Sequence, residues 1–257
     1  MGGAKVRNTI RKWLLRIAAF AAAVGLSGAV VAMTVQPIVV NLSTSGKGMT
    51  QVVTVENTFA NPLPVEIRVE DLSLEPDGVK GTGKDSGDLL VFPVQAMIKP
   101  GETQTFRVQY VGNPDLAKSK HYYATVAQLP VELPHGQSAI QILYNFQILV
   151  SVSPQGAKPD LKVTGASIGH DPAGKPVPVV TLSNASNAHG YLSQGRLRIV
   201  ERDSAGKEVF RRTLSGPEIQ QTIGFGLVGA GQTRKVQVPV ELPQDGGSVE
   251  AQFTPGG

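Results

Sequence analysis

The chain has 257 residues, of which 24 are basic and 20 are acidic, and it contains no cysteine. The absence of cysteine excludes disulfide bonds, thiol catalysis and cysteine-ligated metal sites. The formal charge of +4 does not indicate a nucleic-acid partner, because five basic residues lie in a short N-terminal segment and the rest of the chain carries 19 basic and 20 acidic residues.

Residues 1–32 have the pattern of a secretory signal peptide. The five basic residues come first, without an acidic residue among them: Lys5, Arg7, Arg11, Lys12 and Arg16. An alanine-rich apolar run follows and ends in small residues at Ala32. A membrane anchor is the alternative, but the run from 17 to 32 has 16 residues, fewer than the roughly 20 that span a bilayer. We therefore expect cleavage after Ala32, export, and no membrane insertion of the mature protein.

Residues 33–154 contain short β-type segments separated by Gly, Pro, Asn and Asp. The expected strands are 34–42, 51–56, 64–72, 89–97, 103–111, 121–129 and 139–152. Seven strands over about 120 residues are typical of an immunoglobulin-like β-sandwich. The acidic stretch 70–88 is expected to be a solvated hairpin tip rather than a calcium loop, because its spacing does not fit an EF-hand.

The seventh of these segments, 139–152, has the clearest alternation. Every second residue from Ile140 to Val152 is apolar, and the residues between them are mostly polar. A period of two places the apolar set on one face of a strand that is longer than the usual five or six residues. Such a strand can close its own domain's core and still offer apolar side chains to a partner. The pattern therefore predicts a protein that lends a strand to another protein.

The remainder of the chain predicts a second β-domain. Residues 155–159 form a linker bounded by prolines, and residues 160–257 contain expected strands at 160–168, 177–184, 196–202, 208–214 and 234–242. No convincing amphipathic helix is found. The expected fold is all-β, with two immunoglobulin-like β-sandwich domains in tandem after a cleaved signal peptide.

No residue pattern indicates catalysis or a bound metal. The four histidines are scattered without the spacing of an ordinary zinc site: His121, His135, His170 and His189. The segment around Ser193 lacks the glycine spacing of a nucleophile elbow. We therefore expect a protein that is not an enzyme and that needs no cofactor.

Several segments together resemble the periplasmic pilus chaperones of the chaperone–usher pathway (PapD-like). MTVQPIVVNL and VVTVEN are similar to the opening strands of that family. FPVQAMIKPGETQTFRVQY is similar to a stretch in which a Pro-Gly turn leads into a strand that carries arginine. HYYATVAQLP and AIQILYNFQILVSVSP resemble its sixth and seventh strands. In the second domain the resemblance is weaker and lies in PVVTLSNASNAHGYL and GAGQTRKV.

The resemblance implies a periplasmic chaperone of pilus or surface-fibre subunits, with an outer-membrane usher as a further possible partner. In that family the seventh strand of the chaperone completes the sandwich of its client by β-strand addition. By position, Ile140, Ile142 and Tyr144 would enter the client. Phe146 would either join them or turn into the core of the chaperone's own domain.

The sequence departs from the family where the client's C-terminal carboxylate is held. The family has an arginine in its first strand and a lysine in its seventh, and the matching positions here are Val39, or Ile38, and Leu149. Neither aliphatic side chain can bind a carboxylate. Three other basic residues could anchor the carboxylate in their place, although only their charge suggests it: Lys47, Arg107 and Lys120.

A second departure concerns the link between the domains. A charged pair of the family is replaced here by Ser119 and Ser153. With both charged sites lost, a second hypothesis stays open: an exported structural or adhesive β-sandwich module of a surface layer or fibre. An outer-membrane usher and small secreted subunits encoded beside this gene would favour the chaperone hypothesis over the structural module.

Overall fold

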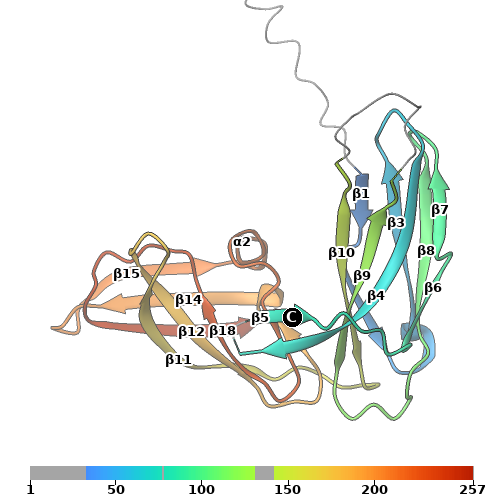
Figure 1. Ribbon diagram of the computed structural model, residues 1–257. Helices are drawn as coiled ribbons and strands as arrows, with labels where there is room; N and C mark the ends of the chain where they lie inside the picture. The colour runs from blue at the N-terminus through green and yellow to red at the C-terminus, as the bar shows by residue number, and fades with distance from the viewer. Residues whose placement is uncertain (1–32, 77, 131–141, 257) are drawn as a thin grey trace, which may run out of the picture.

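The computed structural model describes residues 33–76, 78–130 and 142–256. Figure 1 shows two β-rich lobes that meet at one end and are inclined to each other. The chain order places the first lobe before Pro154 and the second after it. No helix in the described ranges is long and apolar enough to cross a membrane. Ala32 and the segment before it lie outside the described residues.

The first domain is a sandwich of two sheets. One sheet has the order β1-β3-β8-β6, with the strands Met33–Gln36, Thr50–Asn57, Thr103–Tyr110 and Leu89–Phe92. The other has the order β2-β10-β9-β4-β5, with the strands Val39–Ser43, Asn145–Ser153, Lys120–Gln128, Leu63–Glu75 and Gly78–Gly81; β7 (Gln95–Ile98) also pairs with β4. A short 3-10 helix, η1 (Gly46–Met49), joins β2 to β3.

Two of the expected strands are each divided by a proline. The expected strand 34–42 is β1 and β2, which belong to different sheets and flank Pro37. The expected strand 89–97 is β6 and β7, which flank Pro93 in the same way. Proline has no N–H to donate to a ladder, so the chain leaves one sheet at these points and joins the other.

The core of the first domain lies between its two sheets. Alternate residues of the strands point inward, as the period of two requires, and among them Val40, Phe106, Tyr122 and Val150 are at most 1% exposed. Strands from both ends of the domain sequence contribute, so the sandwich closes only when β10 docks beside β9 and β2.

The second domain has its own hydrophobic core. Its sheets are β11-β12-β17 (Leu161–His170, Pro176–Asn184, Thr233–Gln237), β15-β14-β18 (Glu208–Leu214, Gly195–Arg202, Ser248–Pro255) and the short pair β13-β16 (Gly190–Tyr191, Leu227–Val228). The 3-10 helix η2 (Leu192–Gln194) precedes β14. A helix that the sequence pattern did not indicate, α2 (Gly216–Thr222), starts at a capping box formed by Ser215 and Glu218.

The acidic stretch 70–88 is more than a solvated hairpin tip. Strand β4 continues to Glu75 and forms a hairpin with β5 that extends toward the second domain (Figure 1). Gln232 Nε2 of the second domain donates a hydrogen bond to the carbonyl oxygen of Glu75, with an N–O distance of 3.1 Å. The expected hairpin is present, but its tip is not simply solvated: the apolar side chain of Leu74 lies against the backbone of the second domain at Gly229.

The start of the seventh expected strand is also corrected. Strand β10 begins at Asn145, whereas residues 142–144 are not in a strand and residues 139–141 lie outside the described residues. The neighbouring strand β9 ends at Gln128, two residues before Pro130, so residues 142 and 143 have no ladder partner among the described residues.

Candidate functional site

Strand β10 has one half that is paired on both sides and one half that is paired on one side only. It runs antiparallel to β9 from Asn145 to Val152. Its other neighbour, β2, is parallel and begins at the pair of Leu149 with Val39. Within the described residues, Asn145 to Ile148 therefore form an open strand edge, and a strand from elsewhere can pair there.

The hydrogen-bonding groups along this edge can be assigned by alternation. The carbonyl oxygen of Tyr144 accepts a hydrogen bond from Gln128 N on the β9 side, at 3.0 Å. Leu149 N donates to the carbonyl oxygen of Ile38 on the other side, also at 3.0 Å. Because successive residues of an antiparallel strand direct their N–H and C=O groups to opposite sides, Asn145 and Gln147 direct theirs to the open edge.

The even-numbered side chains become more exposed toward the N-terminal end of this segment. Val150 is fully buried, Ile148 is 1% exposed and Phe146 is half-buried against the core. Tyr144 is 36% exposed and Ile142 is 69% exposed. One apolar face thus runs from the core of the domain to solvent.

Two of the four expected client-binding residues are outside the core, and one is outside the described residues. Ile142 projects from the domain, and the Tyr144 ring lies 5.7 Å from the ring of Phe59. Phe146 takes an intermediate position between core and open edge. Ile140 falls in the range that the structure does not describe. Of the described three, only Phe146 belongs to β10, and the exposure of the side chains increases from Phe146 through Tyr144 to Ile142.

Val39 and Leu149, which stand where the family resemblance implies two basic residues, lie opposite each other in the parallel ladder. They mark the point at which β2 covers the edge of β10. A groove of about 740 Å³ begins beside them, with Ile38, Val39 and Val52 on the first domain and Phe225 on the second. None of the residues that line this groove is charged. Its surface suits an apolar group, whereas a carboxylate would find no cation.

The substitute anchors do not lie in this groove. Lys120 is bound to Asp88 at 2.9 Å, and this ion pair raises the pKa of the lysine. Arg107 is on β8, where its backbone pairs with Val52 and Phe92 in the sheet opposite β10. Lys47 is in η1. The structure therefore does not bring these three cations together at the Val39–Leu149 pair.

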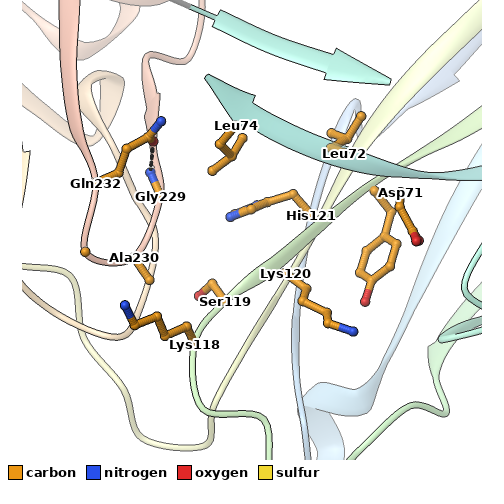
Figure 2. Close-up of a pocket in the computed structure, with 12 residues that line it drawn as sticks. Asp71, Leu72, Leu74, Lys118, Ser119, Lys120, His121, Gly229, Ala230 and Gln232 are labelled. Carbon is orange, nitrogen blue, oxygen red and sulfur yellow. Dashed lines mark hydrogen bonds between the residues drawn. The ribbon is translucent and has the colours of Figure 1, made fainter. Parts of the chain in front are cut away.

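The two serines at the lost charged pair are in contact. Ser119 Oγ and Ser153 Oγ are 2.7 Å apart, and each lies within 3.1 Å of Nδ1 of His189 in the second domain. No sequence pattern linked the histidine to these serines, because it is 70 residues from Ser119 and 36 from Ser153. A second cavity of about 450 Å³ lies on the other side of this contact, between β4, the start of β9 and the loop before β17 (Figure 2).

Comparisons with known proteins agree with this architecture. Residues 32–158 match the family model "Pili and flagellar-assembly chaperone, PapD N-terminal domain". No curated protein matches the chain. Among solved structures, the YadV chaperone is 14% identical, with a TM-score of 0.53, and the match covers 86% of this chain and 91% of that one.

Two solved complexes are similar over nearly the whole chain. The CsuC–CsuE chaperone–tip adhesion subunit pre-assembly complex from archaic Csu pili of Acinetobacter baumannii matches at 16% identity and a TM-score of 0.50, covering 86% of this chain and 97% of that one. A chaperone–tip adhesin complex of CFA/I fimbriae matches at 12% identity and a TM-score of 0.50, covering 87% and 99%. At these identities the structures establish the two-domain fold. Residues 32–158, just under half of the chain, are therefore similar to the PapD N-terminal domain of pili and flagellar-assembly chaperones, and the two-domain fold of the whole chain is similar to that of the solved chaperones.

Proposed function

We propose that this protein is a periplasmic chaperone that binds pilus subunits along the open edge of β10. The observation that carries the proposal is the edge itself. Asn145 and Gln147 direct backbone groups to a side of β10 on which the described part of the chain supplies no strand, and the neighbouring Ile142 side chain is exposed to solvent. The family of the first domain and the likeness to chaperone–subunit complexes support a pilus subunit as the partner.

Binding would use both features of the edge. A client strand would form main-chain hydrogen bonds with Asn145 and Gln147, which give affinity without sequence specificity. Ile142, Tyr144 and the outer part of Phe146 would fill apolar pockets of the client. Each such side chain contributes about 1.5–3 kcal/mol when it is fully buried. We propose these three residues, together with Ile140, as the client-binding residues.

The groove beside Val39 and Leu149 would receive the end of the bound strand. From Leu149 onward β2 occupies the side of β10 on which a client strand would add, so an added strand must stop or turn at this point. The groove there has an uncharged lining. We therefore expect the client to be held by strand pairing and apolar contact at this end, rather than by capture of its C-terminal carboxylate.

Co-expression in the periplasm tests the proposed function. The protein should be purified together with small pilus subunits encoded beside its gene, and a subunit expressed alone should be degraded or should aggregate. Recovery of this chain within purified surface fibres, with no complex in periplasmic extracts, would favour the structural or adhesive module instead.

Export is expected to remove residues 1–32. The mature protein should then begin at Met33 and contain no tryptophan, because Trp13 is the only one in the chain. Intact-mass spectrometry of protein from a periplasmic extract measures the N-terminus directly. Tryptophan fluorescence in the purified periplasmic form would contradict cleavage after Ala32.

A further inference from the structure

The domains meet through a network of uncharged polar side chains. The second domain contributes His189, just before β13, and Tyr191, the last residue of β13; they are 8% and 3% exposed. His189 Nδ1 faces the two serine hydroxyls, and its Nε2 lies 2.9 Å from Asn41 Oδ1. The Tyr191 hydroxyl donates to Asn41 Oδ1 at 2.9 Å, and its oxygen lies 3.1 Å from Ser151 Oγ, which can donate to it.

A second histidine extends this network into the first domain. His121, on β9, is 5% exposed, and its Nδ1 lies 2.9 Å from Ser151 Oγ. Its ring centroid is 5.2 Å from that of His189 in an edge-to-face arrangement. Figure 2 shows the His121 ring projecting into the cavity between Leu74 and Ser119. The two imidazoles therefore share one buried junction.

The hydrogen-bond partners of His189 determine which tautomer of the neutral imidazole is present. An amide oxygen can only accept, so Nε2 carries the proton that is donated to Asn41, and Nδ1 accepts from a serine hydroxyl. Ser119 Oγ also accepts from the backbone N–H of His189, at 2.9 Å. A proton added at Nδ1 would turn this acceptor into a donor, so the two serine hydroxyls would have to reorient and a positive charge would be buried beside them.

Charged groups near the junction do not compensate for a protonated imidazole. Asp71, Lys118 and Lys120 line the cavity beside His121. Asp71 Oδ1 accepts from Ser86, and Lys120 is paired with Asp88. No carboxylate in the described part of the chain is hydrogen-bonded to either junction imidazole. Burial accordingly lowers the pKa of His189 to about 4, and burial together with the neighbouring His189 lowers that of His121 to about 3.

The junction is continuous with the strands that form the candidate site. Asn41 pairs with Ser151 in the parallel ladder of β2 and β10, two residues beyond the Val39–Leu149 pair. The Tyr191 ring lies 6.3 Å from that of Phe225, which lines the uncharged groove. A change in the orientation of the second domain would therefore alter the groove at the end of the open edge.

We infer that His189 is a pH-sensitive latch between the two domains, in which the neutral imidazole holds them in the orientation of Figure 1 and the imidazolium releases them. Opening must also break the contacts of the Tyr191 hydroxyl with Asn41 and Ser151. Further restraints are the hairpin contact at Glu75 and the backbone bond from Ser119 N to Asn187 O. The inference concerns the domain junction and does not depend on the identity of the client.

The pH range follows from the direction of the shift. In the open form the imidazole is solvated and titrates near its ordinary pKa of 6.5, whereas in the closed form it titrates near 4. Above pH 6.5 neither form binds the proton and the latch has its full strength. Between pH 6.5 and 4 only the open form is protonated, so the ratio of open to closed protein rises by about tenfold per pH unit from this one site. Below pH 4 both forms are protonated and the ratio levels off.

Small-angle X-ray scattering of the mature protein from pH 7.5 to 4 measures the opening, and near-UV circular dichroism monitors the fold of each domain over the same range. The wild type should expand while its tyrosine signal is retained. His189→Gln, which cannot be charged, should have dimensions that do not change over this range, whether it is closed or already open at pH 7.5. The control is His170→Gln, which removes an exposed histidine bonded to Asp245 and should follow the wild type.

Two results would overturn the latch. One is an identical pH profile in the wild type and in His189→Gln. The other is expansion that coincides with loss of the tyrosine signal, because acid would then be unfolding the domains rather than parting them. An NMR titration of the His189 ring adds an independent reading: a pKa close to 6.5 in protein that is still closed would equally exclude the mechanism.

Discussion

Ile142→Asp should leave the protein folded and abolish binding of a pilus subunit. Ile142 is 69% exposed and lies before the first residue of β10, so a carboxylate there remains in water in the free protein. In the complex it would be buried unpaired in an apolar pocket, at a cost of several kcal/mol. Since 1.4 kcal/mol is a tenfold change in affinity, binding should fall by about a hundredfold or more.

Val150→Asp is the matched substitution on the same face. Val150 is fully buried in the first domain, so its replacement places the same charge in the core. The cost is then comparable to the whole stability of a domain, about 5–15 kcal/mol, and we expect the first domain to unfold. Thermal melts of both variants, together with co-purification of a coexpressed subunit, separate the two effects. Full subunit binding by folded Ile142→Asp would refute strand donation through this face.

Much of the first domain could be predicted from the sequence, because each strand has one face toward the core and a period of two identifies that face. The prediction placed the start of β10 too early for a physical reason. The alternation continues from Val150 through Tyr144 to Ile142 without a break, yet the chain supplies a neighbouring strand only from Tyr144 onward. A pattern of apolar residues reports which face will be buried, but not whether the residues that bury it belong to the same chain.

The junction could not be predicted, since it joins residues that are distant in sequence. His121 and His189 come from different domains, and as single histidines they belong to no sequence motif. The sequence did indicate that Ser119 and Ser153 stand where a charged pair was expected. It did not indicate that the two hydroxyls contact each other and that an imidazole completes the link.

The helix α2 was missed for a different reason. It has seven residues and buries one of them, Ile219, so it is too short to show a helical period. The capping box of Ser215 and Glu218 was the local signal available. Its position matters for the site, because Gln220 of this helix lines the uncharged groove together with Phe225.

Gln147→Pro should weaken subunit binding through the backbone alone. The N–H of Gln147 is directed to the open edge and away from β9, so its loss does not break the ladder that holds β10 in the sandwich. Proline is tolerated on strand edges for this reason. In the complex, however, a carbonyl oxygen of the client would lose its donor and the proline ring would stand in the path of the added strand.

The loss of the hydrogen bond and the unpaired client carbonyl together cost about 2 kcal/mol, or roughly a 30-fold loss of affinity before any clash of the ring is counted. Gln147→Ala, which removes the exposed side chain and keeps the N–H, should bind as the wild type does. Ile148→Pro removes an N–H that faces β9 at a position 1% exposed, and it should unfold the domain. The test measures the dissociation constant of each Gln147 variant for one purified subunit. The melting temperature of each variant, measured in parallel, shows whether it is folded. Equal affinity of folded Gln147→Pro and Gln147→Ala would mean that the client does not add a strand at this edge, and that the apolar side chains alone account for binding.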